Sequence, residues 1–201
     1  MKSINSHFKS KDPVIFQVLQ KFGDISVSKP AHPNTFFYKL CREIASQQLA
    51  GKAADAIFSR FEALFPNKKI TPKNVIKTPH EVLRSVGLSN AKARYIRNIA
   101  EAVESKLLRF HDLPLMEDEE VVEHLIQIKG IGRWTAEMFL MFTLGRENVF
   151  SHGDLGLRNA MKKLYKFRKE PTRDHIEKIV KKWSPYKTYA SLALWKSLDN
   201  R

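Results

Sequence analysis

Residues 127–137 read QIKGIGRWTAE, with Gly130 and Gly132 on either side of a single isoleucine. Apolar residues recur at helical spacing on both sides, in 119–127 and in 134–144, so the glycines fall in a short turn between two predicted helices. Glycine adopts left-handed backbone angles and lets another chain approach without interference from a Cβ atom. Backbone N–H groups of such a turn, and of the helix start that follows, point outward together and can hold an anionic oxygen. The stretch therefore predicts a helical hairpin whose turn binds a phosphate.

The residues inside the turn support this interpretation. We expect Ile131 to tuck between the two helices, while Lys129 and Arg133 place positive charge beside the glycines. A GxG pair alone does not identify a phosphate site, because many helix–helix turns contain glycine. Together with the two basic neighbours, the pattern makes Lys129, Gly130, Ile131, Gly132 and Arg133 the predicted phosphate-binding segment.

Helix-start signals recur along the rest of the chain. They consist of a capping side chain before a helical run, often with proline next: Asp12-Pro13, Thr71-Pro72, Thr172, and Thr78 at capping-box distance from Glu81. Strand signals are limited to the short segments 24–27 and 148–150. The sequence therefore predicts an all-α protein of about ten short helices.

The composition is that of a globular protein with an excess of positive charge. Hydrophobic residues make up 43% of the chain and charged residues 28%, which excludes a disordered or membrane-embedded chain. Lys and Arg number 35 against 21 Asp and Glu, giving a net charge of +14. General solubility could account for some of this excess, but a surplus this large is typical of proteins that bind nucleic acid.

Cys41 is the only cysteine, so the chain has no internal disulfide, no thiolate-held iron–sulfur cluster and no multi-cysteine zinc site. The histidines show no metal-ligand spacing, and we expect no required cofactor. No apolar run resembles a signal peptide or a membrane span. We therefore expect an intracellular protein, cytoplasmic (at the nucleoid) in a prokaryote or nuclear in a eukaryote.

Four segments occur in an order that is more specific than any one of them: IASQQLAGKAA (44–54), VGLSNAKARYIRNIA (86–100), LIQIKGIGRWTAEMFLMFTLGRENVFSHGDLGLR (125–158) and WSPYKTYASLALW (183–195). In this order they resemble the helix-hairpin-helix DNA glycosylases, in particular the alkylation-repair branch, DNA-3-methyladenine glycosylase II. The resemblance spans roughly residues 34–196. It implies the compact form of that branch, without an N-terminal β-rich domain.

The resemblance also implies a two-lobed helix-hairpin-helix glycosylase fold. One helical lobe would comprise residues 36–145 and contain the hairpin, 119–144. The other would be formed by residues 1–35 together with 146–201. The active site would then lie in the cleft between the lobes.

Asp154, in SHGDLGLR, is the candidate catalytic residue, because it occupies the position of the family's aspartate after the hairpin. Cleavage of an N-glycosidic bond develops positive charge on the sugar, which a fixed carboxylate stabilises, or the carboxylate activates water. Asp154 also precedes a predicted helix, whose dipole favours negative charge at its start. A simple helix cap is the alternative role, and His152 lies close enough to influence the site.

Trp134 stands where strand-cleaving members of the family carry a Schiff-base lysine, so the resemblance implies a monofunctional enzyme without lyase activity. An alkylated purine is cationic and is attracted to aromatic faces once flipped out of the duplex. The resemblance implies a base pocket containing Trp134, Trp195, Phe36, Phe150 and Tyr189. For any single aromatic the alternative is core packing, which we prefer for Trp183, Phe139 and Phe142.

The family also inserts side chains into the gap left by the flipped nucleotide. Gln48 matches the alkylation branch best, Gln47 matches other branches, and Leu88 matches a second wedge position. Ordinary helix ends would equally account for these three. On the following helix we expect Lys92 and Arg94 to contact DNA phosphates, although such charges often only face solvent.

The family holds a monovalent or divalent structural ion with backbone carbonyls around its hairpin. The matching carbonyl donors here would be those of Ile126, Ile128 and Gly130. The resemblance transfers these atoms by position only, and no side chain in the segment adds to the assignment.

The sequence therefore predicts a monomeric DNA glycosylase that excises alkylated purines, of the 3-methyladenine and 7-methylguanine type, from double-stranded DNA and leaves an abasic site. A non-catalytic helix-hairpin-helix DNA-binding module is the main alternative, since it needs the hairpin and the basic charge but not Asp154. A glycosylase for another damaged base is a further alternative. A bifunctional glycosylase-lyase is disfavoured by Trp134.

Overall fold

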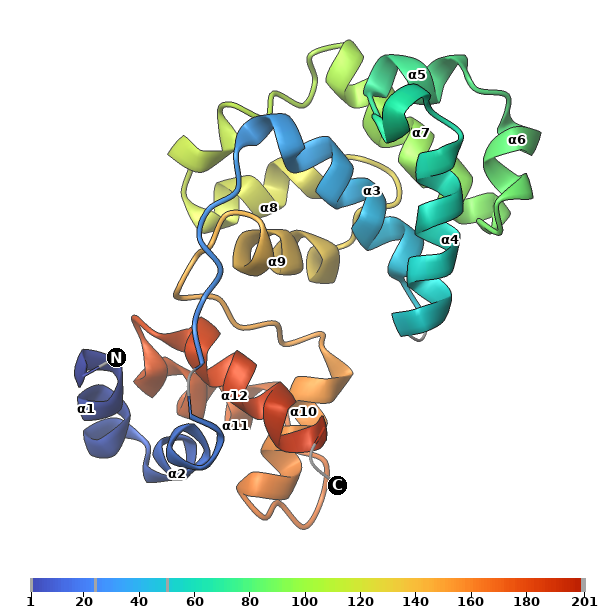
Figure 1. Ribbon diagram of the computed structural model, residues 1–201. Coiled ribbons are helices and arrows are strands. Elements are labelled where there is room, and N and C mark those ends of the chain that lie inside the picture. Colours follow the sequence, from blue (N-terminus) through green and yellow to red (C-terminus); the bar gives the residue numbers. More distant parts are fainter. Residues whose placement is uncertain (1, 24, 50, 200–201) are drawn as a thin grey trace. The chain divides into compact units, whose positions relative to one another are not determined.

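The computed structural model describes residues 2–23, 25–49 and 51–199 (Figure 1). Over these residues the chain forms twelve α-helices, four 3₁₀ helices and no strand, which confirms the all-α prediction. Helices outnumber the predicted ten because some are short: α5 (Pro72–Lys77) and α6 (His80–Ser85) have six residues each. Neither strand signal yields a strand, and Asp24, in the first of them, lies outside the described residues.

The chain divides into two compact units. The terminal unit comprises the residues up to Pro30 and those from Leu140 onward, and the central unit comprises Ala31–Phe139. The boundaries predicted from the sequence, at 35 and 145, lie a few residues later.

The helices of the terminal unit are α1 (Lys2–Lys11), α2 (Pro13–Phe22), α10 (Leu155–Leu164), α11 (Arg173–Val180), the 3₁₀ helix η4 (Lys181–Trp183) and α12 (Lys187–Asp199). Those of the central unit are η1 (Pro33–Thr35), α3 (Phe36–Ser46), α4 (Gly51–Ala63), η2 (Pro66–Lys68), α5, α6, α7 (Asn90–Glu104), η3 (Leu113–Leu115) and α8 (Asp118–Ile126). The helix α9 (Arg133–Phe142) begins in the central unit and ends in the terminal one.

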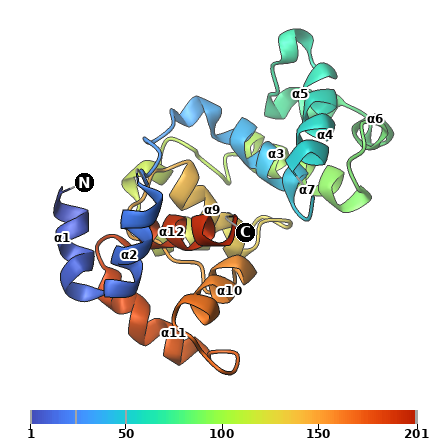
Figure 2. The same cartoon turned by 60° about the horizontal axis from the view of Figure 1, so that its bottom comes forward.

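In the terminal unit, α12 packs against both α2 and α10 (Figure 2). Apolar side chains at helical spacing fill the space between them, among them Ile15 on α2, Leu157 and Met161 on α10 and Leu194 on α12, all fully buried. Burial of each such side chain stabilises the fold by about 1.5–3 kcal/mol. This core fixes the start of α10 and the helix α12, on which the candidate site is built.

A buried carboxylate, Asp12, joins three parts of the same unit. Its Oδ1 accepts the N–H groups of Val14 and Ile15 and so caps α2, as its position before Pro13 predicts. Its Oδ2 accepts the hydroxyl of Tyr165, at 2.6 Å, and the indole N–H of Trp183, at 2.7 Å. Burial, and the negative charge of Asp12, raise the pKa of Tyr165. Trp183 is therefore a core residue, as we expected.

Of the other helix starts named from the sequence, two are confirmed and one is wrong. Thr71 and Thr172 cap α5 and α11 by accepting backbone N–H groups. Thr78, however, does not cap α6: its hydroxyl donates to the carbonyl of Asn74, and α6 begins after Pro79 without a side-chain cap. The prediction was wrong because Thr78 serves the end of α5 instead.

In the central unit, α7 is the longest helix and packs against α3, α5 and α6. Its buried face combines Ile96 and Ile99 with the small residues Ala93 and Ala100, which let neighbouring helices approach closely. Arg97, on the same helix, donates to the carbonyls of Ile76 and Thr78 and thereby closes the end of α5. The helix α7 thus joins three other helices of this unit.

Cys41 lies fully buried on α3, and this burial raises the pKa of its thiol well above the usual range. Among the described helices, none is both long and apolar enough to cross a membrane.

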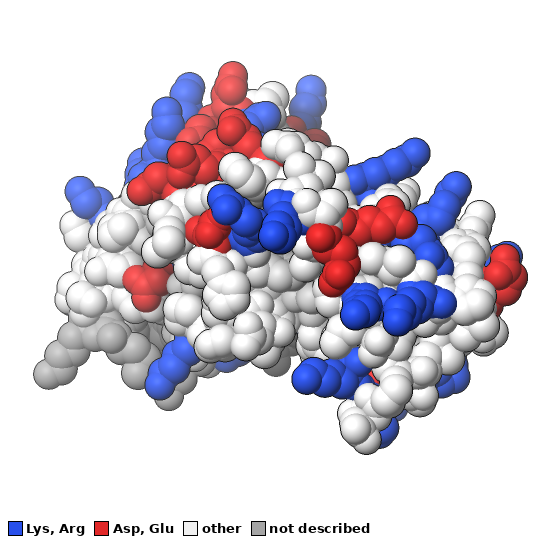
Figure 3. All heavy atoms as spheres, turned by 90° about the horizontal axis from the view of Figure 1, so that it is seen from above, with Lys and Arg blue, Asp and Glu red and all other residues white. Residues whose placement is uncertain are grey.

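On one face of the molecule the basic side chains do not form a single continuous patch (Figure 3). On the face drawn in Figure 3, Lys and Arg side chains lie among uncharged residues and beside several Asp and Glu side chains. Positive and negative side chains are therefore intermixed on this face (Figure 3).

Candidate functional site

The hairpin predicted from the sequence is present. The helices α8 and α9 are joined by residues 127–132, and Ile131 is 4% exposed, held by a 3.0 Å hydrogen bond from its N–H to the carbonyl of Ile128. The side chain of Ile131 is therefore buried, as expected.

The two glycines of the turn differ in what they require. Gly130 has φ +113, and a Cβ atom there would lie 2.2 Å from Cγ of Tyr95 on α7. Gly132 does not have a left-handed φ, and a Cβ atom there would meet nothing within 4 Å. The prediction that both glycines adopt left-handed angles is therefore wrong for Gly132. Gly130 makes room for Tyr95 of this chain, and Gly132 is the glycine with open space beside it.

A second contact from α7 holds the same turn. The side-chain amide of Asn98 donates to the carbonyl of Lys129 at 2.8 Å, while the Lys129 side chain is exposed. The backbone of Lys129 is therefore held by α7 while its side chain is exposed beside the turn, and its contact with a phosphate stays a prediction.

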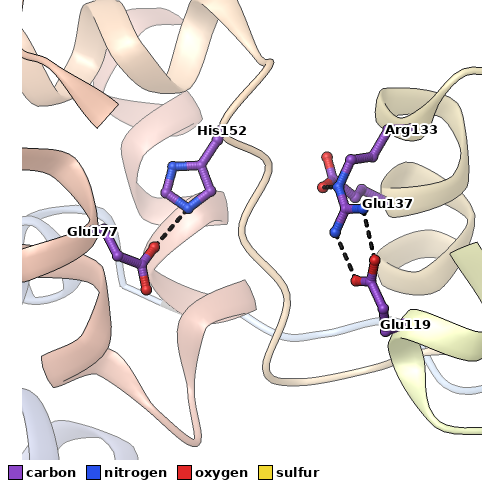
Figure 4. A network of polar contacts seen from close by, with 5 residues as sticks. All are labelled: Glu119, Arg133, Glu137, His152 and Glu177. Atoms are coloured by element: carbon purple, nitrogen blue, oxygen red, sulfur yellow. Dashed lines mark hydrogen bonds and ion pairs between the residues drawn. The ribbon is translucent and has the colours of Figure 1, made fainter. Parts of the chain in front are cut away.

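Arg133 lies between two carboxylates (Figure 4). Its guanidinium makes a bidentate pair with Glu119, with N···O distances of 2.6 and 2.7 Å, and a further contact of 3.1 Å with Glu137. These hydrogen bonds raise the pKa of Arg133 and lower that of Glu119. The group ties the start of α9 to the start of α8, and it leaves the Arg133 charge neutralised within the hairpin.

The two remaining predicted phosphate ligands also differ. Arg94 is exposed on α7. Lys92 is half-buried, and its ammonium donates to backbone carbonyls at the end of α3. Of the two, Arg94 is the more exposed.

The turn after α3 separates the two glutamines. The side chain of Gln47 donates to the hydroxyl of Thr135 on α9 at 3.1 Å. Gln48 is exposed and has φ +57, an uncommon angle for a residue other than glycine. Ala50, which follows this turn, lies outside the described residues. Of the two, Gln48 is the one presented to solvent.

Leu88 is 4% exposed, which contradicts its prediction as a wedge. It follows Gly87, whose φ of +101 turns the chain between α6 and α7, and its side chain packs into the core of the central unit. The alternative, a contact at a helix end, holds for this residue.

In the terminal unit, Asp154 caps α10. Its Oδ1 accepts the N–H of Leu157 at 2.7 Å and also the indole N–H of Trp195, on α12, at 3.0 Å. Only 9% of the residue is exposed. The carboxylate is thus held in one orientation by a helix start and by an aromatic side chain.

Trp195 is half-buried and lies beside Phe142, with ring centroids 5.9 Å apart and ring planes tilted by 32°. Phe142 is 39% exposed, so our preference for core packing is wrong for this residue, whereas Phe139 is 2% exposed and belongs to the core. Asp154, Trp195 and Phe142 therefore form one cluster, with an aromatic surface next to a carboxylate.

Gly156, two residues after Asp154, makes the cluster possible. A Cβ atom at this position would lie 3.1 Å from Oδ1 of Asp154 and 3.3 Å from Cδ1 and Nε1 of Trp195. These separations are tighter than ordinary contacts, so any larger residue would displace one partner of the hydrogen bond.

Residues 41–185, which include both the hairpin and Asp154, match the HhH-GPD superfamily of base excision DNA repair proteins. The chain belongs to this superfamily. A curated member, DNA-3-methyladenine glycosylase 1 of Schizosaccharomyces pombe, is 35% identical over 193 residues, covering 95% of this chain and 85% of the relative.

Solved HhH-GPD structures agree with this membership. The fold superposes with a TM-score of 0.88 on the 3-methyladenine DNA glycosylase Mag1 of S. pombe in complex with abasic DNA, at 34% identity and over 98% of this chain and 97% of that one. A DNA-3-methyladenine glycosidase from Bacillus halodurans gives a TM-score of 0.83 at 40% identity, over 96% and 88% of the two chains.

The other aromatics assigned from the HhH-GPD resemblance are unequally exposed. Trp134, at the start of α9, is 37% exposed. Phe36 has no exposed surface and packs edge-on against Phe110 and Phe139, so it is not available to line a base pocket.

Phe150 and Tyr189 are nearly as inaccessible. Phe150 is 7% exposed and packs edge-on against Trp183. The hydroxyl of Tyr189 donates to Glu147, and burial together with this carboxylate raises the pKa of Tyr189 to about 12. Both residues belong to the interior of the terminal unit rather than to an open surface.

His152, just before Asp154, pairs with Glu177 on α11 at 2.8 Å (Figure 4). Its ring also packs edge-on against Phe150. The histidine therefore anchors the segment between α9 and α10.

Among the carbonyls predicted to hold an ion at the HhH-GPD hairpin, that of Ile128 accepts the N–H of Ile131. Ile126 is 44% exposed, and Gly130 is fixed by its φ of +113. A carbonyl oxygen has two lone pairs, so Ile128 retains one for a cation, and the ion site stays a prediction.

Sequence reasoning missed Phe142 and Gly156. Helical periodicity had assigned Phe142 to the core, and a glycine inside a helix start carries no signal of what packs against it. The exposure of Phe142 was not recoverable from the pattern, but Gly156 in the motif SHGDLGLR could have been questioned, because glycine disfavours helices.

Proposed function

We propose that this HhH-GPD protein is a monofunctional DNA glycosylase that releases alkylated purines, of the 3-methyladenine and 7-methylguanine type, from double-stranded DNA and leaves an abasic site. The observation that supports this best is the carboxylate of Asp154, whose Oδ1 is held by Leu157 and Trp195 beside an exposed aromatic ring. The relatedness to proteins named DNA-3-methyladenine glycosylase supports the same substrate class.

Asp154 would act on the sugar. As the N-glycosidic bond breaks, its electron pair leaves with the base and positive charge develops on the deoxyribose ring. A carboxylate in fixed orientation stabilises that charge, and it can accept a proton from the water molecule that adds to the anomeric carbon. Two hydrogen bonds to Oδ1 hold the carboxylate in place before the substrate arrives.

Trp195 and Phe142 would contact the base. An N3- or N7-alkylated purine carries positive charge, which an electron-rich ring face attracts by cation–π interaction, worth about 0.5–2 kcal/mol. Normal bases lack this charge and are poorer leaving groups. An aromatic surface beside one carboxylate would therefore favour alkylated purines over normal bases, because they bind the rings more strongly and because their glycosidic bond breaks more easily.

The absence of strand cleavage follows from Trp134. Schiff-base chemistry needs an amine at the position directly after the hairpin, and an indole cannot form an imine with the abasic sugar. The reaction would therefore end at hydrolysis.

The hairpin would bind the DNA backbone, with Gly132, Lys129 and Arg94 as the exposed contacts and Gln48 as the side chain that fills the gap. Mag1, with a TM-score of 0.88, is described in complex with abasic DNA, which supports DNA as the partner of this chain. We propose that the protein acts as a monomer wherever the genome is kept, in the cytoplasm of a prokaryote or the nucleus of a eukaryote.

Incubation with methylated duplex DNA tests the proposal. We expect free methylated purines in the supernatant, and strand breaks only after alkali. Asp154→Asn is the control, and it should retain DNA binding while base release slows by about 10²- to 10⁴-fold.

Other outcomes identify the alternatives. Binding without any base release would favour a DNA-binding module. Strand breaks without alkali, with a borohydride-trapped adduct, would indicate a lyase. Release from deaminated or oxidised DNA alone would point to another damaged base.

A further inference from the structure

Lys92 makes contacts that a phosphate ligand would not need. Its ammonium donates to the carbonyl of Ala45 at 2.8 Å and to that of Gln47 at 2.6 Å. These carbonyls belong to the last turn of α3, where backbone acceptors have no partner within the helix. Two of the three ammonium donors are thus used inside the central unit.

The location of Lys92 is locally unfavourable. It lies in the first turn of α7, where its own N–H donates to the capping hydroxyl of Ser89 and where the helix dipole disfavours a cation. The side chain is half-buried, and desolvation lowers the pKa of Lys92. The carboxyl end of α3 offsets this cost, because a helix C-terminus attracts positive charge. A local conflict of this kind is expected where a residue serves a particular geometry.

The carbonyls that Lys92 binds lie just before Gln48, a residue with a left-handed backbone angle. Gln47 is the C-cap of α3, and Gln48 follows with φ +57 and an exposed side chain. A left-handed angle is unfavourable for a residue with a side chain, so contacts from outside the turn help to hold this conformation.

The same turn is held from a second direction. The side chain of Gln47 donates to Thr135, which is buried on α9, in the hairpin that also carries Trp134. The main chain of the turn is thus bound to α7 and the side chain of Gln47 to α9, while the side chains of Gln48 and Leu49 are exposed.

We propose that Lys92 is a positioning residue, which holds the turn after α3 so that Gln48 is preset to enter the gap in a DNA duplex. This rests on the proposed function, in which Gln48 fills that gap. Lys92 acts through Gln48 and does not neutralise a phosphate.

A salt titration separates the two roles. We would measure the affinity of the full chain for a duplex with an abasic analogue at several salt concentrations. Lys92→Met should weaken binding about tenfold at each salt concentration. The slope of log K against log salt should not change, because no phosphate contact is lost.

Arg94→Met is the matched control, since it removes an exposed cation two residues further along α7. If Arg94 contacts a phosphate, this slope should become shallower by about 0.9. A change of that size for Lys92→Met would overturn the proposal, because it would show direct contact with the DNA backbone.

A double-mutant cycle tests whether Lys92 acts through Gln48. In a Gln48→Ala background, Lys92→Met should cost less than about twofold in affinity, because the side chain that it positions is already gone. Full additivity of the two losses would overturn the proposal. Lys92→Arg, which keeps donors and charge, should restore most of the affinity in the presence of Gln48.

Folding and function are controlled separately. If Lys92→Met does not fold, as judged from thermal unfolding, Lys92→Gln takes its place in the same cycle. Because these measurements need no base release, a wild-type protein that binds abasic DNA but frees no methylated purine would refute the proposed activity and leave the coupling between Lys92 and Gln48 intact.

Discussion

Nε1 of Trp195 lies 3.0 Å from Oδ1 of Asp154, so the candidate pocket aromatic also orients the candidate catalytic carboxylate. The tryptophan therefore has two separable roles. One is the ring face, shared with Phe142, and the other is the N–H group.

Trp195→Phe should separate these roles, because it keeps an aromatic ring and removes the donor. We expect single-turnover base release to slow by about tenfold, the effect of losing one hydrogen bond to a charged group, with little change in DNA affinity. Trp183→Phe is the matched control: it removes an indole N–H from Asp12, outside the candidate site. That variant should lower the melting temperature and leave the rate unchanged, and equal rates for both variants would argue against an orienting role for Trp195.

Gly156→Ala should lower activity without lowering stability. Alanine favours helix over glycine by about 1 kcal/mol, and Gly156 has no left-handed φ to strain. Its Cβ atom would nevertheless press on both partners of the Asp154–Trp195 hydrogen bond. Thermal unfolding and single-turnover base release measure the two effects. Gly153→Ala, with nothing within 4 Å of the added atom, should change neither, and an unimpaired Gly156→Ala would show that the pair tolerates displacement.

The two hairpin glycines should respond differently to substitution. In Gly130→Ala the added Cβ atom would clash with Tyr95, and alanine would have to adopt a φ of +113. The free energy of unfolding should therefore fall by about 1–3 kcal/mol. A Cβ atom at Gly132 meets nothing within 4 Å, so stability should hold in Gly132→Val while affinity falls for all DNA sequences alike. Unchanged DNA affinity of Gly132→Val would mean that the backbone of DNA does not approach this glycine.

Lys129 and Arg133, four residues apart, should give opposite results. Lys129→Gln removes an exposed charge beside the turn, so the slope of log K against log salt should become shallower by about 0.9. Arg133→Gln should lower the melting temperature, because Glu119 and the buried Glu137 would both lose their ion pair with Arg133, and the salt slope should stay as in the wild type. A shallower slope for Arg133→Gln would show that Arg133 contacts a DNA phosphate.

The hairpin and the cap of α10 could be predicted because their signals are local. Glycine in a turn, a capping aspartate before a helical run and apolar residues at helical spacing each act within a few residues of chain. The exposure of Phe142 could not be predicted in this way, because it depends on how α12 brings Trp195 next to it.

The roles of the cations were the least predictable. Lys92 and Arg133 were predicted to contact DNA phosphates, but Lys92 is bound to carbonyls at the end of α3 and Arg133 to a carboxylate of α8. Such partners are set by tertiary packing, and sequence spacing contains no trace of them. The prediction of Leu88 as a wedge was wrong for the same reason, because a residue next to a turn is expected to be exposed unless the surrounding helices cover it.

The burial of Cys41 bears on survival under the conditions in which such a protein would be needed. Alkylating agents attack thiolates more readily than purines, and the thiolate is the reactive form of cysteine. The only thiol of this chain is kept neutral and out of reach in the core of the central unit. The protein would therefore resist electrophiles of the kind that create the proposed substrate, and thiol labelling should proceed only as fast as the central unit opens.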